Sequence, residues 1–321
     1  MSHEPPHGRG MGIAIALCAA IGATTVVATM ATTAVGHGFS SSQRAEAEYG
    51  QRLIAHTTEY LGPDVTNAKM RFMSSRLACA SCHIGAGVEP GNLSLVAAMS
   101  RYPRISPRSG GNETIEDRVN GCMVRSMNGQ PLPTDSPEMT AMVAWLRFLS
   151  AQDAAMGADQ RKLHESPAFK TPNRAADPET GERVFGKRCA ACHGKEGAGL
   201  PASTKLVDGY LFPPLWGSNS FNDGAGLHRV LTAARFIKAK MPLGRADLTD
   251  DEAFDVAAYV NSKPRPHMAN LERDYPDRSK KPVDTSYPPY ADSFPVEQHL
   301  LGPFAPIEKY YKGAHAAATR P

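Results

Sequence analysis

The chain has 321 residues, 41% of them hydrophobic, and a formal net charge of +3. This length allows two domains with terminal extensions. The nearly balanced charge gives no reason to expect nucleic acid as a partner, because domains that bind it carry a strong basic excess. We therefore predict a two-domain protein that does not bind nucleic acid.

The N-terminal region contains an apolar stretch, residues 11–36, that carries no charged side chain and follows Arg9. Its 26 residues are enough to span a bilayer and exceed the usual core of a signal peptide. The stretch favours an N-terminal apolar helix within residues 1–40 that anchors the protein in the inner membrane. The alternative is a cleaved signal peptide, which would leave a soluble periplasmic protein.

The next region predicts a helical domain, residues 41–152. Residues 41–61 are compatible with a helix that begins at a serine cap. Thr114 caps a second, short helix, and Ser136 with Pro137 begins a third. This third helix carries an apolar stripe at helical spacing, which indicates core packing: Met139, Met142, Val143, Leu146 and Leu149.

A polar segment, residues 153–176, is predicted to link this domain to a second one, residues 177–264, that repeats its order of elements. Residues 265–321 contain several prolines and aromatics with little periodicity, so we expect an extended tail packed over the domains. The helix signals in the second domain are Asp177-Pro178, the periodic stretch 227–240, and a capping box formed by Thr249 with Glu252.

One pentapeptide occurs twice, as Cys79-Ala80-Ser81-Cys82-His83 and Cys189-Ala190-Ala191-Cys192-His193. The C-x-x-C-H pattern is typical of a c-type haem, to which the thiols bind covalently while the histidine binds the iron. A zinc site built from the two C-x-x-C units would leave both histidines unexplained. We predict two covalently bound haem c groups in an all-α fold of two tandem cytochrome c domains. Because haem c is attached after export, the domains are expected to face the periplasm.

The second haem needs a distal ligand, and the best candidate is Met241, which precedes Pro242 shortly before the last helix. Methionine ligation raises the reduction potential and suits electron transfer. His228 is a rival, although an ordinary surface histidine explains it better. Lys240 is adjacent to Met241, and a lysine amine can bind iron once it has lost its proton.

In the first domain the equivalent position is occupied by Cys122, with Met123 and Met127 nearby. Two interpretations stay open. Either a methionine binds the iron and Cys122 is a small buried hydrophobe, or Cys122 is a thiolate ligand. In a helix, Arg118 and Arg125 share a face with Cys122, and neighbouring cations stabilise a thiolate.

Further polar side chains surround Cys122 in the sequence. Ser126 lies one turn beyond it, and three arginines precede the helix: Arg101, Arg104 and Arg108. A basic pocket beside a haem would suit a small anionic substrate, because guanidinium groups bind oxyanions. The alternative is a solvated basic loop.

These residues resemble those of the dihaem thiosulfate dehydrogenases, the tetrathionate-forming family, over about residues 45–310. In the first domain the matching stretches are Arg108-Ser109-Gly110, residues 114–122 and residues 125–129. Beyond it they are residues 212–217, Ser220-Phe221-Asn222, residues 236–244, residues 289–292 and Gly302-Pro303-Phe304.

The resemblance implies that His83 and Cys122 bind the first haem iron and that catalysis occurs beside them. It implies that His193 binds the second iron, with Lys240 and Met241 as alternative distal ligands that exchange with redox state. It further implies a substrate pocket that contains Arg108, Arg118, Arg125 and Ser126.

The predicted activity is the coupling of two thiosulfates to tetrathionate. Electrons would pass from the first haem to the second, and then to a soluble cytochrome c or a membrane oxidase. Arginines would offset the repulsion between the two dianions, and a sulfane sulfur could bond to the Cys122 sulfur before the second thiosulfate attacks. One alternative is a membrane-tethered dihaem electron carrier without its own substrate. Another is a tetrathionate reductase that uses the same site.

Overall fold

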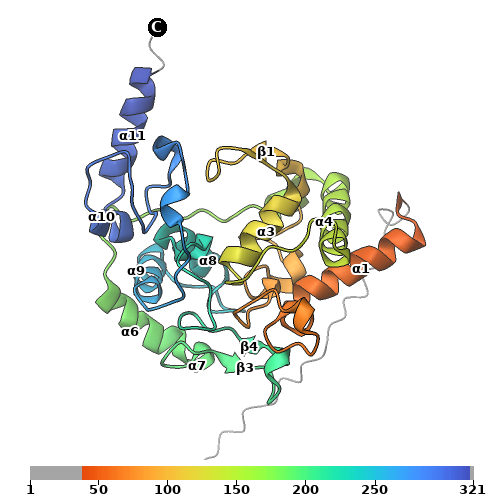
Figure 1. The fold of residues 1–321 in the computed structure, drawn as a ribbon. Coiled ribbons are helices and arrows are strands. Elements are labelled where there is room, and N and C mark those ends of the chain that lie inside the picture. Colours follow the sequence, from red (N-terminus) through yellow and green to blue (C-terminus); the bar gives the residue numbers. More distant parts are fainter. Residues whose placement is uncertain (1–37, 319–321) are drawn as a thin grey trace, which may run out of the picture.

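The computed structural model describes residues 38–318 as a predominantly helical protein (Figure 1). The predicted N-terminal apolar helix, residues 11–36, lies outside the described residues. Within residues 38–318, no helix combines the length and apolar character needed to cross a membrane. The helices form two units with one repeated order of elements, as the sequence predicts.

The first unit contains four helices, α1 (Ser41–Ala55), α2 (Thr57–Leu61), α3 (Ile115–Arg125) and α4 (Pro137–Ala155). A short antiparallel pair precedes α3, in which β1 (Arg104–Ile105) pairs with β2 (Asn112–Glu113). Oxygen atoms of side chains accept hydrogen bonds from backbone N–H groups in the first helical turns. These caps are Ser40 on α1, Thr114 on α3 and Ser136 on α4.

The second unit contains α6 (Pro178–Arg188), α7 (Ala190–His193), α8 (Val230–Lys240) and α9 (Asp250–Asn261). A second strand pair, β3 (Leu200–Pro201) with β4 (Tyr210–Phe212), is an addition to the predicted all-α fold. The connecting segment contains α5 (Ala158–Leu163). Single turns of 3₁₀ helix cover 68–70, 79–81, 84–87, 99–101, 206–208, 226–228, 271–273 and 278–280.

In each unit the first helix crosses the last helix at a glycine. A Cβ atom on Gly50 of α1 would lie 1.9 Å from the carbonyl oxygen of Ala141 in α4. A Cβ atom on Gly181 of α6 would lie 2.1 Å from the carbonyl oxygen of Asp255 in α9. Only a residue without a Cβ atom allows two helix backbones to approach so closely. The two units therefore share one packing solution, reached with different sequences.

The close helix crossing in the second unit predicts that a larger residue at Gly181 destabilises the protein. Gly181→Val is expected to lower the free energy of unfolding by about 3 kcal/mol, because a backbone carbonyl cannot move aside for the new side chain. Gly186→Val on the same helix is the matched control, since no atom lies within 4 Å of its Cβ position. Denaturant titration followed by circular dichroism measures both variants, and equal unfolding midpoints would contradict the close crossing.

The tail, residues 265–321, is less extended than its prolines indicate. It contains α10 (Val296–Leu301) and α11 (Ala305–Ala318). Its earlier part runs across the first unit, where the backbone N–H of Tyr275 donates to the carbonyl of Arg108 at 2.7 Å. Three tail side chains are buried in the core that α8 and α9 build: Phe304, Ile307 and Tyr311. The tail therefore contacts both units.

Candidate functional site

The first C-x-x-C-H motif places His83 on the wall of a cavity of about 580 Å³, which residues of α3 and α4 also line. Nδ1 of His83 lies 2.8 Å from the backbone carbonyl oxygen of Leu93. A carbonyl can only accept, so Nδ1 carries the ring proton and Nε2 keeps its lone pair. Burial lowers the pKa of His83 and so favours the neutral ring. This is the tautomer that iron ligation through Nε2 requires.

The second motif repeats this arrangement in a cavity of about 440 Å³. Nδ1 of His193 lies 2.8 Å from the carbonyl oxygen of Pro213, and burial again lowers the pKa of the ring. Cys189 and Cys192 line the same cavity. In the first motif, Cys79 lines the cavity of His83, whereas Cys82 lies on the wall of the second cavity. With a neutral histidine and at least one thiol of its own motif, each cavity fits one c-type haem.

A zinc site assembled from both motifs has no support in the structure. Across residues 38–318, three or more His, Cys, Asp or Glu side chains nowhere gather as they would around a metal ion. A structural zinc needs four such ligands in tetrahedral arrangement. The haem interpretation, in contrast, accounts for the thiols and the histidine of each motif together.

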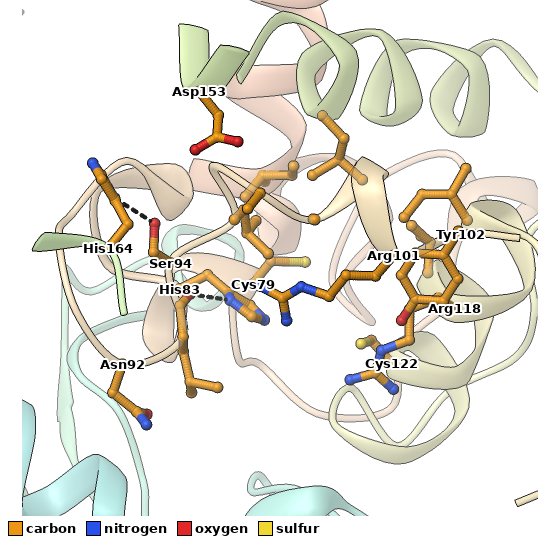
Figure 2. Close-up of a pocket in the computed structure, with 18 of the residues that line it drawn as sticks. Cys79, His83, Asn92, Ser94, Arg101, Tyr102, Arg118, Cys122, Asp153 and His164 are labelled. Atoms are coloured by element: carbon orange, nitrogen blue, oxygen red, sulfur yellow. Dashed lines mark hydrogen bonds between the residues drawn. The ribbon is translucent and has the colours of Figure 1, made fainter. Parts of the chain in front are cut away.

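Helix α3 contributes Cys122 to the first cavity. The helix begins at a capping box in which Thr114 and Asp117 each accept a backbone hydrogen bond from the other. This fixed start places Arg118 one turn before Cys122 on the same face. Figure 2 shows the Cys122 side chain at the cavity that His83 also lines. The full contribution of α3 to the wall is Ile115, Arg118, Val119, Cys122 and Met123.

The two nearby methionines differ in position from Cys122. Met123 reaches the cavity wall but is 1% exposed within the apolar core, and Met127 is 3% exposed in that core. Cys122 is only half-buried. Of these three sulfur-containing residues, Cys122 is therefore the accessible one, while the methionines pack the helix against its neighbours.

Two arginines line the cavity together with Cys122. Figure 2 shows Arg101 and Arg118 beside the cavity that contains His83. The neighbouring Cys122 sulfur raises the pKa of Arg118 above its usual value, although desolvation by the surrounding protein atoms opposes that rise. Arg118 is nevertheless exposed to solvent. Within the described part of the chain, neither guanidinium group forms a hydrogen bond or an ion pair. Both cations are therefore available to an anion in the cavity.

The other residues of the implied substrate pocket do not line this cavity. Arg108 and Arg125 instead bind the two carboxylate oxygens of Asp274, each at 2.8 Å. Ser126 ends α3, and its backbone N–H donates to the carbonyl of Cys122 at 2.8 Å. The structure thus separates the five predicted arginines: two line the cavity, two bind a tail carboxylate, and Arg104 pairs with Glu113.

Asn222, from the second unit, closes the C-terminal end of α3. Its Nδ2 donates to the Val124 carbonyl at 2.8 Å, and its backbone N–H donates to the Arg125 carbonyl at 3.2 Å. These bonds satisfy carbonyls that a helix end leaves unpaired. In the sequence, Asn222 is marked only by its place in a stretch that matches the family, and no motif or spacing marks Asp274.

The two candidate distal ligands of the second haem point to different places. Met241 lines the second cavity, whereas Nζ of Lys240 donates to the carbonyl of Pro90 in the first unit. Both ring nitrogens of His228 face backbone carbonyl oxygens, at 2.9 and 3.3 Å. Of the three side chains, Met241 is the one positioned to bind a metal in this cavity.

The geometry at Met241 makes a prediction about the second haem. Met241→Gly is expected to lower its midpoint potential by at least about 60 mV, a tenfold shift in a one-electron equilibrium, because a thioether ligand favours the reduced state. Lys240→Ala should keep the high potential. Spectroelectrochemical titration measures both variants, and an unchanged potential in Met241→Gly would exclude it as the ligand.

The two cavities meet at the first motif. Cys82, Ala80 and Ser81 from the first unit form part of the wall of the second cavity, opposite the second motif. The attachment segment of one motif therefore borders the space beside the other. Such close approach suits electron transfer between two bound groups.

Comparisons with known proteins agree with this geometry. Residues 69–154 match the SoxA/TsdA cytochrome c domain, and residues 176–260 match the family described as cytochrome c oxidase, cbb3-type, subunit III. Both halves of the chain are thus cytochrome c domains, each containing one C-x-x-C-H motif.

Several relatives carry the name thiosulfate dehydrogenase. The protein from Allochromatium vinosum is 43% identical over 223 residues, which cover 68% of this chain and 77% of the relative. The protein from Psychrobacter arcticus is 38% identical over 237 residues, which cover 73% of this chain and 67% of the relative.

A solved structure supports the same assignment. The thiosulfate dehydrogenase TsdBA from Marichromatium purpuratum, in its as-isolated form, superimposes with a TM-score of 0.63 at 32% identity. The match covers 72% of this chain and 49% of that one, so the present chain spans about half of its length. On the combined evidence of motifs, cavities and relatives, the chain belongs to the thiosulfate dehydrogenase family of cytochrome c oxidoreductases.

Proposed function

We propose that this protein oxidises thiosulfate, joining two molecules into tetrathionate. The observation that carries the proposal is the half-buried Cys122 sulfur beside the unpaired cations Arg118 and Arg101, in the cavity of His83. The reaction forms one sulfur–sulfur bond between two dianions and releases two electrons without a proton. A site for this reaction must hold two anions beside an electron acceptor and must keep water from reacting with the sulfur adduct.

Arg101 and Arg118 supply the electrostatic part of this task. Two dianions repel one another, and guanidinium groups offset that repulsion while orienting sulfonate oxygens by charge-assisted hydrogen bonds. Both residues are exposed, so an anion from solution can reach them. Arg118 lies one helical turn from Cys122, so an anion bound to it would present its sulfane sulfur near the Cys122 sulfur.

Cys122 supplies the sulfur chemistry. Its thiolate bonds to the sulfane sulfur of one thiosulfate, giving a cysteine S-thiosulfonate and releasing two electrons. The sulfane sulfur of the second thiosulfate then attacks the adduct at the sulfur bound to Cys122, which forms tetrathionate and returns the thiolate. Haem groups held at His83 and His193 would supply one-electron acceptors for these electrons, and a soluble cytochrome c or a membrane oxidase would suit as the final acceptor.

The haem content is a separate prediction. Cys79 and Cys82, and likewise Cys189 and Cys192, are each spaced to form two thioethers with one haem. Mass spectrometry of the denatured protein should show two haem additions that survive denaturation. Loss of either pair, as in Cys189→Ala with Cys192→Ala, should leave a single addition. One addition in the wild-type protein would contradict the tandem arrangement.

A direct experiment separates enzyme from carrier. Thiosulfate alone, added to the oxidised protein in the absence of any partner, should reduce both haems and yield tetrathionate in proportion. An electron carrier without its own substrate would stay oxidised until a reduced partner is added. Absence of reduction by thiosulfate at any concentration would therefore overturn the proposed activity.

We propose further that residues 11–36 hold the protein at the periplasmic face of the inner membrane. Support comes from the length and lack of charge of this stretch. Fractionation of cells should place the protein with the membranes, and deletion of residues 1–36 should release it when an unrelated signal peptide directs export. An N-terminus that begins between Thr32 and Phe39 in the mature protein would establish cleavage instead.

A further inference from the structure

A carboxylate from the tail lies behind the cavity, at the C-terminal end of α3. Asp274 is 9% exposed, and its two oxygens bind Arg108 and Arg125 at 2.8 Å each. The hydroxyl of Tyr287 donates to the same carboxylate at 2.6 Å. Burial alone would raise the pKa of Asp274, but Tyr287 and the two arginines outweigh it and hold that pKa below its usual value. The carboxylate is thus a charged, fully engaged group.

The backbone around Asp274 is held firmly in place. Tyr275 has a φ angle of 57°, a left-handed conformation that a tyrosine adopts only under constraint from its surroundings. Its N–H donates to the Arg108 carbonyl at 2.7 Å. Arg278 donates to the carbonyls of both Asp274 and Tyr275. The carboxylate is therefore presented from a rigid turn and not from a mobile loop.

The two arginines meet a second fixed acceptor. Arg108 and Arg125 both donate to the carbonyl of Gly224, at 3.4 and 3.1 Å. A Cβ atom on Gly224 would lie 2.8 Å from Nη1 of Arg125, so only glycine leaves room for this contact. The Gly224 carbonyl and the Asp274 carboxylate, from two different parts of the chain, thus meet at both guanidinium groups.

Helix α3 depends on such external support. It has 11 residues, and helices of this length are marginal without tertiary contacts. Arg125 lies three residues after Cys122, so the direction of the Arg125 side chain and the rotation of Cys122 about the helix axis are linked. A held Arg125 therefore fixes the rotation of the helix face that carries Cys122 and Arg118.

We propose that Asp274 is a positioning residue for the Cys122 site, acting through Arg108 and Arg125. It holds the last turn of α3 in the rotation that directs Cys122 into the cavity. It also keeps two guanidinium groups occupied, so that an anionic substrate is directed to Arg118 and Arg101. The inference deepens the proposed thiosulfate oxidation and rests on it for the kinetic part of its test.

The test compares Asp274→Asn, which removes the charge, with Asp274→Glu, which keeps it. The first readout is the electron paramagnetic resonance spectrum of the oxidised holoprotein without thiosulfate, which reports the ligands of the first haem iron, among which we expect Cys122. Asp274→Asn should change this spectrum and lower kcat/KM for thiosulfate by about a hundredfold, since small misplacements of a reacting group have such effects. Asp274→Glu, which keeps the negative charge, should retain more of the wild-type spectrum and of the wild-type kcat/KM than Asp274→Asn.

Two further variants make the outcome decisive. Asp277→Asn is the matched control, because Asp277 is exposed in the same tail segment and, among residues 38–318, its side chain bonds only to Ser279 and Lys280. Tyr287→Phe removes one hydrogen bond to Asp274 and should give a smaller change of the same kind, even if Asp274→Asn does not fold. Wild-type spectra and kinetics in Asp274→Asn and Tyr287→Phe would overturn the inference. The inference would also be overturned if each variant lost activity only in proportion to its fraction of unfolded protein. Because the spectrum is recorded without thiosulfate, it tests positioning even if the proposed activity fails.

Discussion

Cys122→Gly is expected to abolish thiosulfate oxidation while the protein still folds with both haems attached. The loss in kcat should reach at least about 10³-fold, the scale seen when a residue that forms a covalent intermediate is removed. Attachment should survive because Cys79, Cys82 and His83 lie outside α3 and keep their own contacts. The fold should survive because Cys122 lies on a cavity wall and leaves the buried Met123 in place.

A second substitution separates two roles of the sulfur. Cys122→Met keeps a sulfur that can bind iron but cannot form the thiolate needed for a disulfide-like adduct. We expect it to restore a six-coordinate spectrum without restoring turnover. Steady-state assays of tetrathionate formation and absorption spectra of the oxidised protein measure the two effects. Full tetrathionate formation by Cys122→Gly would contradict the mechanism, and a methionine-ligated spectrum in the wild type would favour an electron carrier.

Local sequence signals were sufficient for the helical frame of the protein. Thr114, Ser136 and Thr249 each precede an apolar pattern, and each caps a helix in the structure. Caps act within one turn, so the necessary information lies within four or five residues. The C-x-x-C-H motifs are equally local, since the two thiols and the histidine belong to one turn of chain.

The residues that support the site could not be found in this way. Asp274 binds Arg125 across 149 positions of sequence, and Asn222 binds the Val124 carbonyl across 98. No period or spacing connects such pairs, because they meet only after both units and the tail have packed. Helical periodicity places Arg125 on the same helix face as Cys122. The position of the Arg125 guanidinium, however, is determined by the carboxylate of Asp274 in the tail.

The tail shows a second limit of local reasoning. Residues 296–301 and 305–318 form helices although prolines flank and begin them. Proline is acceptable in the first turn of a helix, where its missing N–H would have no partner. The burial of Phe304 and Ile307 against α8 and α9 then stabilises helices too short to persist alone.

Arg118 is expected to be the second most sensitive position. Arg118→Gln should lower kcat/KM for thiosulfate by about a hundredfold, since a hydrogen bond to a charged group contributes about 1.5–3 kcal/mol and each 1.4 kcal/mol is tenfold. The spectrum of the oxidised protein should change less than the kinetics, because the proposed role of Arg118 is to bind the substrate anion, while its charge acts on the Cys122 sulfur only from the neighbouring turn. Stopped-flow reduction by thiosulfate measures the first effect and resting-state spectra measure the second.

Arg104→Gln is the matched control for this prediction. Arg104 lies in β1, which pairs with the strand just before α3, but its guanidinium pairs with Glu113 at 2.9 Å and lies 4.8 Å from the ring centre of Tyr102. A general loss of positive charge near the cavity would affect both variants alike and would weaken as salt screens it. A direct contact, in contrast, affects only Arg118→Gln, and the loss persists at high ionic strength. Equal kinetics for the two variants would show that the cavity attracts thiosulfate by its overall field, and that Arg118 does not bind it.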